Sequence, residues 1–204
     1  MKKQQGNNGN VLWMTELALM AAIVIIMAFT PLGYLRVGAI EMTFIVIPVA
    51  VGAVMLGVKG GAILGLIFGL SSFAQCFGMS AFGTMLFGVN PVGTAFACIV
   101  PRICVGVVPA LLYKVFRKID KKDRWSIAVS CLLSPLTNTA LYLACVCFIF
   151  QQEMMDMYQY TGKGGLHFLF WVFALVALNA VLEAVSSLLI GTAICKALKK
   201  VFRQ

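Results

Sequence analysis

Long apolar runs dominate this sequence, and they restrict its fold more than any single motif does. Hydrophobic residues make up 61% of the 204 residues, and only 11% of the residues are charged. A soluble domain carries about 25% charged residues. A helix of about 20 apolar residues, rising about 1.5 Å per residue, crosses the ~30 Å hydrocarbon core of a bilayer. The sequence therefore predicts an integral membrane protein that sits in the lipid bilayer.

The apolar runs predict six spans: Val11–Phe29, Thr43–Val58, Gly61–Phe77, Val92–Val115, Ser126–Phe150 and His167–Leu198. The second and third spans are short and nearly fused around Lys59. Alternating segments of about ten residues, which a transmembrane β-barrel needs, are absent from the sequence. We therefore expect an all-α bundle of six transmembrane helices that forms one domain over residues 1–204, preceded by a short cytoplasmic tail at residues 1–10.

Basic residues are distributed unevenly along the predicted topology. Thirteen of the 16 Lys and Arg residues precede the first span, follow the last, or lie in the two turns on the same side of the membrane. Cytoplasmic loops carry an excess of Lys and Arg, so both termini are predicted to be cytoplasmic. This distribution also accounts for the net charge of +9 and argues against nucleic-acid binding.

Small residues mark one predicted helix contact. Gly61, Gly65 and Gly69 form overlapping G-x-x-x-G patterns, which let two helices approach closely in lipid. We expect these glycines to pack helices inside the bundle rather than to form a dimer face. The predicted outer loop 78–91 alternates aromatic residues with glycines, which suits either a membrane-surface loop or a lid over a ligand.

Residues for metal binding or nucleophilic catalysis are scarce. The seven cysteines are scattered through apolar runs without a C-x-x-C pair, as expected for small buried hydrophobes. The single histidine, His167, has no metal-ligating neighbours at helical spacing. Motifs for a serine nucleophile, a zinc protease or a phosphate-binding loop are also missing. We therefore expect no metal, no cofactor and no enzymatic activity.

Four polar residues on three spans are predicted to share one depth in the membrane. At helical rise, Arg102, Asn138, Asn179 and Glu183 lie about 18 to 24 Å above the inner boundary. Ionisable groups at this depth are costly, so they are candidates for function. Arg102 stays charged and needs an anion or several carbonyls beside it. Either Glu183 forms a structural salt bridge with it, or a substrate carboxylate binds its guanidinium while Asn138 and Asn179 contribute amide groups.

Further residues are assigned to the same candidate substrate site. Tyr142 would pack against the ligand, and Asn90, at the outer start of span four, completes the set. Pro101 directly precedes Arg102, and Pro135 precedes the polar stretch of span five. Proline removes a helical hydrogen bond, so we expect these two helices to be broken there and to expose backbone carbonyls near the site.

Short motifs follow one another along nearly the whole chain: Ala18-x-x-x-Ala22, Thr30-Pro-Leu-Gly-Tyr34, Ile47-Pro-Val49, Gly52-Ala-Val-Met-Leu-Gly-Val-Lys-Gly-Gly-Ala62, Pro101-Arg102, Asn138-Thr139 and Asn179-x-x-x-Glu183. Together they resemble the substrate-binding S components of energy-coupling-factor (ECF) vitamin transporters. The resemblance is to the branch that covers riboflavin, folate and pantothenate, and the pantothenate-type members are the most similar.

This resemblance implies a division of labour. An S component captures one vitamin at the outer face of the bacterial cell membrane. It then docks through its first helix on a membrane scaffold (T) subunit that two cytoplasmic ATPases drive. Ala18 and Ala22 would form the docking face, although ordinary internal packing is an alternative use of small residues. The chain has no ATPase motif of its own.

The polar residues fit pantothenate better than the other vitamins of this branch. Pantothenate offers one carboxylate, one amide and two hydroxyls to Arg102, Asn138 and Asn179. Riboflavin is neutral, and folate is a large dianion, but these vitamins or another small acid such as niacin remain alternatives. A solitary proton-coupled carrier using Glu183 is an alternative of another class. The inverted repeats that would favour a carrier are not seen between the two halves.

Overall fold

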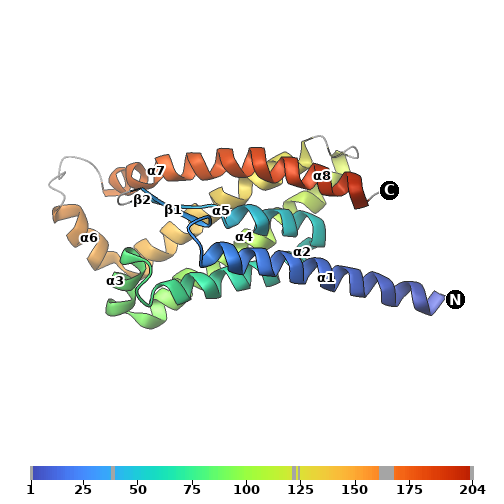
Figure 1. Ribbon diagram of the computed structural model, residues 1–204. Coiled ribbons are helices and arrows are strands. Elements are labelled where there is room, and N and C mark those ends of the chain that lie inside the picture. The colour runs from blue at the N-terminus through green and yellow to red at the C-terminus, as the bar shows by residue number, and fades with distance from the viewer. Residues whose placement is uncertain (1, 38–39, 121–122, 124, 161–167, 203–204) are drawn as a thin grey trace.

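Helices form most of the structure, and the longest run between two opposite ends of the molecule (Figure 1). The computed structural model describes residues 2–37, 40–120, 123, 125–160 and 168–202. In chain order the elements are α1 (Lys2–Ala28), β1 (Tyr34–Val37), β2 (Ile40–Thr43), α2 (Val46–Gln75), α3 (Ala81–Val89), α4 (Pro91–Ile119), α5 (Ser126–Ile149), α6 (Gln151–Tyr160), α7 (Phe168–Ser186), the π-helical η1 (Ser187–Gly191) and α8 (Thr192–Phe202). Both chain ends lie at one end of the molecule, and α3 and α6 lie at the other.

By length and composition, five helices of the described chain are suited to crossing a membrane: Gly9–Ala28, Val46–Gln75, Pro91–Ile119, Ser126–Ile149 and Asn179–Val201. They agree with the prediction of a helical, multi-pass membrane protein. Predicted spans two and three both fall on α2, so the count of helices differs from six. Residues 2–10, expected to form a tail, are helical and extend α1. His167, the predicted start of the last span, lies outside the described residues.

The α2 helix reverses its direction at Gly57, which explains the different count. Gly57 has φ 75° and ψ −167°, a conformation that glycine adopts without a steric penalty. A Cβ atom added to Gly52 would overlap Leu64 Cδ1, although the two residues would lie about 18 Å apart along a straight helix. The two halves of α2 therefore lie side by side, as Figure 1 also shows, and correspond to predicted spans two and three.

A short antiparallel hairpin is the exception among the described elements, which are otherwise helical, as expected for an all-α fold class. Strands β1 and β2 pair between α1 and α2, with Tyr34 opposite Thr43 and Val37 opposite Ile40. Tyr, Val, Ile and Thr favour extended backbone. These four-residue strands are much shorter than the apolar runs on either side, so the sequence pattern did not predict them. The hairpin continues beyond the strands, because the Phe44 N–H donates to the Gly33 carbonyl at 2.9 Å.

Glycines join α2 closely to α4, as the small-residue pattern predicted. A Cβ on Gly61 would overlap the carbonyl oxygen of Gly106, and one on Gly65 would overlap that of Arg102. Gly69 continues the contact against Ile99. The G-x-x-x-G stripe is therefore used inside the bundle, and it presses the backbone of α4 at Arg102 against α2.

Prolines do not break α4 or α5, contrary to the prediction. Both helices run through Pro101, Pro109 and Pro135. Each proline nevertheless deprives the carbonyl four residues earlier of its helical donor. All three carbonyls accept a side-chain hydrogen bond instead: Ala97 from Arg102 Nη1 (3.0 Å), Val105 from Ser134 Oγ (3.2 Å) and Cys131 from Ser187 Oγ (2.8 Å). The two serines thereby join α4 to α5 and α5 to η1.

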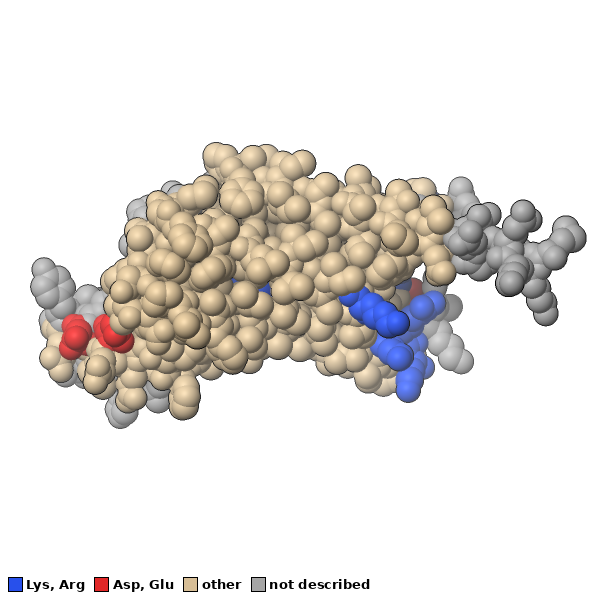
Figure 2. Space-filling view, turned by 90° about the horizontal axis from the view of Figure 1, so that it is seen from below, with Lys and Arg blue, Asp and Glu red and all other residues tan. Residues whose placement is uncertain are grey.

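Charge separates along the molecule, as the sequence predicted. Figure 2 shows Lys and Arg gathered at the end where the chain termini lie, with acidic side chains at the opposite end, where α6 carries Glu153 and Asp156. We call the end with the chain termini the basic end. Its exposed basic residues are Lys59, Lys114, Arg117, Lys118, Lys196 and Lys200. Other basic residues of the prediction, Lys121, Lys122, Arg124, Lys163 and Arg203, lie outside the described residues.

Candidate functional site

Arg102 is a buried cation held between aromatic rings. Its side chain on α4 is only 9% exposed. The guanidinium carbon lies 4.4 Å from the centre of the Tyr142 ring on α5 and 5.7 Å from that of Phe68 on α2. Stacking on aromatic faces stabilises a cation without neutralising it. Nη1 binds Ala97, but Nε is buried and has no hydrogen-bond partner among the described residues.

Glu183 is buried on α7, and its carboxylate is occupied by neighbours other than Arg102. Its Oε1 accepts the backbone N–H of Thr43 at 2.7 Å, and the side chains of Thr43 and Asn179 also hydrogen-bond to the carboxylate. Within the described part of the chain, no ion pair joins Glu183 to Arg102. The structural salt bridge that the sequence left open is therefore not formed, although the charges of Glu183 and Arg102 still act on each other.

The predicted amide residues of α5 and α7 neighbour different members of the candidate site. Asn138 is 7% exposed, and its Oδ1 has no hydrogen-bond partner among the residues described. It precedes Tyr142, the residue stacked on Arg102, by one helical turn. Asn179 precedes Glu183 by one turn and bonds to it. The structure thus joins Arg102 directly to Tyr142, and Glu183 to Asn179.

Asn90 is not brought to Arg102. Its side chain is exposed and caps α4, with Oδ1 accepting the Gly93 N–H at 2.9 Å. Asn is a preferred N-cap residue, and Pro91 follows at the first helical position, where proline is favoured. Arg102 lies twelve residues farther along α4, or about 18 Å at helical rise. The Asn-Pro pair is thus a helix-start signal in this structure, and a contact between Asn90 and a ligand stays a prediction.

Tyr34 is a member of this centre that sequence reasoning did not identify. It projects from β1, and its electrostatic neighbours are Arg102, Ser72 and Gln75. Burial raises the pKa of Tyr34 to about 12, although the charge of Arg102 acts in the opposite direction. Its Oη has no hydrogen-bond partner of acceptable geometry in the described structure. The available signal was its place at the end of the Thr30–Tyr34 motif.

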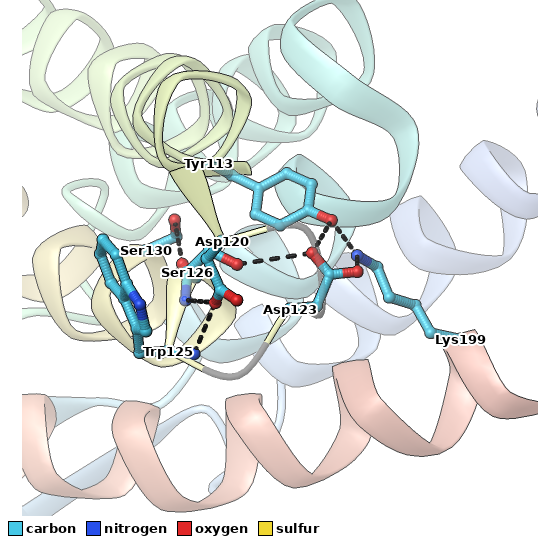
Figure 3. Close-up of polar contacts among 7 residues, drawn as sticks. All are labelled: Tyr113, Asp120, Asp123, Trp125, Ser126, Ser130 and Lys199. Atoms are coloured by element: carbon cyan, nitrogen blue, oxygen red, sulfur yellow. Dashed lines mark hydrogen bonds and ion pairs between the residues drawn. The ribbon is translucent and has the colours of Figure 1, made fainter. Parts of the chain in front are cut away.

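A second polar cluster lies at the basic end of the molecule (Figure 3). Asp123 Oδ1 accepts a hydrogen bond from Tyr113 Oη at 2.9 Å, and Asp123 Oδ2 forms an ion pair with Lys199 Nζ at 3.0 Å. Lys199 also donates to Tyr113 Oη and lies 4.2 Å from the centre of that ring. These contacts join the end of α4 to α8, so Lys199 has a structural partner in addition to its place among the basic residues at this end.

Two aspartates shape the turn at this cluster. Asp120 Oδ2 accepts the backbone N–H groups of Trp125 at 2.8 Å and Ser126 at 3.1 Å, which starts α5. Burial raises the pKa of Asp123, but hydrogen bonds from Lys199 and Tyr113 and the charges of Lys199 and Arg117 outweigh it, so the pKa lies below its usual value. Both aspartates are buried and bonded to groups of the fold, so they add no exposed negative charge to this basic end.

The first helix presents its small residues outward. Ala18 and Ala22 are exposed, whereas Val24 and Ala28 are buried against the bundle. The internal-packing alternative for these alanines therefore does not apply in this structure. Among the described residues, no group of three His, Cys, Asp or Glu side chains is placed to hold a metal ion.

Comparison with known proteins gives a consistent relationship over most of the chain. Residues 13–194 match the family of the ECF transporter, substrate-specific component. The pantothenic acid transporter PanT of Lactococcus lactis subsp. cremoris is 31% identical over 170 residues, which cover 79% of this chain and 79% of that protein. The pantothenate transporter PanT of Leuconostoc mesenteroides subsp. mesenteroides is 24% identical over 198 residues, which cover 92% of each chain. With its apolar helices and buried arginine centre, the chain belongs to the substrate-specific components of ECF transporters.

Proposed function

We propose that this chain is the pantothenate-binding S component of an ECF importer in a bacterial plasma membrane. The observation that carries the proposal is the Arg102 guanidinium, which is buried, stacked on Tyr142 and not paired with Glu183. The names of the two relatives support the same vitamin.

A monoanionic ligand is the natural complement of this centre. Arg102 is buried and has no ion pair among the described residues, so a ligand carboxylate at Arg102 gains electrostatic energy that a neutral ligand cannot gain. Asn138 provides amide groups, and Asn179 and Glu183 provide a second polar side for hydroxyls. Pantothenate carries one carboxylate, one amide and two hydroxyls, and this inventory matches the side chains. Neutral riboflavin brings Arg102 no anionic partner, and the second charge of folate finds no second buried cation among the described residues.

The proposal includes an orientation in the membrane. We assign the basic end, with both termini, to the cytoplasm, and the end with α3 and α6 to the outside. The two halves of α2 then count as two crossings, so residues 1–204 form one membrane domain with six crossings. Arg102 lies eleven residues after the outer start of α4 and seventeen before its inner end, at roughly 17 and 26 Å. The site is thus nearer the outer face, where a capture subunit needs it.

Delivery is assigned to partner subunits. The exposed face of α1 with Ala18 and Ala22 would dock on the membrane scaffold subunit, because small side chains permit close helix approach in lipid. Two cytoplasmic ATPases would energise that scaffold. Ala18→Trp tests this part: vitamin binding should persist while uptake in cells is lost. Val181→Trp, at an exposed position on α7, is the matched control, and normal uptake by the Ala18 variant would overturn the docking assignment.

The central test is a calorimetric titration of the purified chain with pantothenate, riboflavin and folate, without ATP. We expect one-to-one binding of pantothenate alone. Arg102→Ala should abolish binding, and Arg102→Lys should weaken it about 10- to 100-fold because a point charge cannot replace the planar fork. Arg117→Ala, which removes an exposed arginine at the other end of α4, should leave affinity unchanged. Absence of pantothenate binding, or unchanged affinity in Arg102→Ala, would contradict the proposal.

A further inference from the structure

Three residues of the candidate site each carry a buried polar atom without a hydrogen-bond partner among the described residues. These atoms are Arg102 Nε, Tyr34 Oη and Asn138 Oδ1. Folded proteins rarely leave such atoms unpaired, because each lost bond to water carries a cost. Arg102 and Asn138 already belong to the proposed site. Tyr34 presents the same feature and comes from a different element, the β-hairpin.

The hairpin is held so that Tyr34 points into the bundle. Tyr34 pairs with Thr43 across the strands, and the Thr43 N–H is anchored on Glu183 of α7. The preceding residue, Gly33, is packed so tightly that a Cβ there would overlap the Met27 carbonyl oxygen. With one strand fixed on α7 and the turn fixed on α1, the phenol is directed toward α2 and α4, where Arg102 lies.

The surrounding side chains leave the Tyr34 hydroxyl without a bond. Gln75 is a neighbour of Tyr34, and its Nε2 donates to the Ala28 carbonyl at 2.6 Å, so this nitrogen is not a donor to the phenol oxygen. The Ser72 backbone carbonyl accepts from Cys76 Sγ at 3.5 Å, and its hydroxyl does not form an acceptable bond to Tyr34. Because the pKa of Tyr34 is about 12, its hydroxyl keeps its proton at physiological pH and remains a donor.

We propose that Tyr34 contacts the substrate, with its Oη–H donating to the same carboxylate that Arg102 binds. This inference rests on the proposed function. A carboxylate has about four acceptor positions, and Arg102, with Nη1 already used on Ala97, fills only some of them. A neutral phenol adds a donor without adding a second charge, which suits a monoanion. The β-hairpin is then part of the recognition surface and makes the site selective for a carboxylate over an alcohol.

The test compares pantothenate with panthenol, the analogue in which a primary alcohol replaces the carboxylate. Dissociation constants are measured by titration and, for panthenol, by competition up to millimolar concentration, for the wild type and Tyr34→Phe. We expect Tyr34→Phe to bind pantothenate about 10- to 100-fold more weakly and to change panthenol binding by less than about threefold. Thr137→Val removes a hydroxyl already bonded to the Leu133 carbonyl at 2.7 Å, and it should change neither constant.

A second readout separates a recognition role from a structural one. Without ligand, the Tm of Tyr34→Phe in detergent should equal or exceed that of the wild type, because the removed hydroxyl has no partner. The rise in Tm on adding pantothenate should be smaller in the variant. An unchanged pantothenate affinity, an equal loss for both ligands, or a lowered ligand-free Tm would each overturn the role of Tyr34 and leave the proposed function intact. A wild-type protein that does not bind pantothenate would overturn both.

Discussion

Arg102 donates from Nη1 to the carbonyl oxygen of Ala97 at 3.0 Å, and Pro101 is the reason that this oxygen needs a donor. In an unbroken α-helix, the N–H of residue 101 would bond to Ala97. Proline has no N–H, so the next side chain takes its place. In the Pro101-Arg102 pair, the proline leaves the Ala97 carbonyl without a backbone donor, and the arginine side chain donates to that carbonyl. This hydrogen bond fixes one edge of the guanidinium and leaves Nε for a ligand.

Pro101→Ala should therefore stabilise the helix and weaken binding. Alanine restores the backbone donor to Ala97 and competes with Arg102 Nη1 for that oxygen. A hydrogen bond to a charged group is worth about 1.5 kcal/mol or more, so we expect pantothenate affinity to fall about tenfold. The Tm should rise, because proline inside a helix costs up to about 3 kcal/mol. Calorimetry and thermal unfolding in detergent measure both effects.

Pro109→Ala is the control for this prediction. It makes the same substitution at the next proline of α4. There the Val105 carbonyl lacks the backbone donor, and Ser134 rather than Arg102 donates to it. Its affinity for pantothenate should stay at the wild-type value. Equal affinity of Pro101→Ala and the wild type would show that the Ala97 contact does not orient the guanidinium.

Ser134 and Pro109 should be thermodynamically coupled. Ser134 is fully buried, and Ser134→Ala leaves the Val105 carbonyl without any donor, which should cost about 1–3 kcal/mol of unfolding free energy. In the Pro109→Ala background the backbone N–H returns, so the same serine substitution should cost much less. A double-mutant cycle followed by unfolding in detergent measures the difference. Strictly additive effects would refute the link between proline and serine.

Sequence patterns predicted the features that depend on local hydrophobicity and charge. The membrane class followed from the apolar runs, and the reversal in α2 followed from the Gly57–Gly61 segment with Lys59. The α2–α4 contact followed from the glycine stripe, because a close approach in lipid needs small residues at regular spacing. Each of these properties is encoded within a few neighbouring residues of the chain.

Features that depend on distant residues were missed or misjudged. Tyr34 is one of five tyrosines, and only tertiary packing brings it to Arg102, 68 positions later. Lys199 and Asp123 are 76 positions apart. The distribution of Lys and Arg along the sequence indicated topology, but it could not show that these two residues form an ion pair. Pro101 does not break α4, because a side chain from the same helix supplies the missing bond. Depth along a helix singled out Arg102, which is buried in the structure, but it could not show which groups would surround it.

Gly61→Ala should disrupt the α2–α4 contact at Gly106, one helical turn from Arg102. The added Cβ would overlap the Gly106 carbonyl oxygen, and a rigid backbone atom cannot move away as a side chain can. Overpacking of this kind costs about 1–3 kcal/mol, so we expect a lower Tm and weaker pantothenate binding together. Gly88→Ala on α3 is the control, because nothing lies within 4 Å of its added Cβ. A Gly61 variant with wild-type Tm would mean that α2 and α4 do not meet at these glycines.

Asp123 should make the stability of the protein depend on acidic pH. Its folded-state pKa is lowered: burial acts to raise it, but the bonds from Lys199 and Tyr113 and the nearby positive charges prevail. The folded state therefore binds this proton less tightly than the unfolded chain, whose aspartates titrate near pH 4. The stabilisation is complete above that pH and is lost as pH falls through the folded-state pKa.

Asp123→Asn tests this dependence through thermal unfolding between pH 7 and pH 3. The variant should be less stable than the wild type at pH 7, because Lys199 loses its ion pair with Asp123. The gap should narrow as the wild type becomes protonated, so the two Tm curves converge below about pH 4. Asp156→Asn, at an exposed position on α6, should follow the wild-type curve throughout. Parallel curves for Asp123→Asn and the wild type would mean that the cluster stabilises the ends of α4 and α8 at the basic end of the molecule through packing rather than through the charge of Asp123.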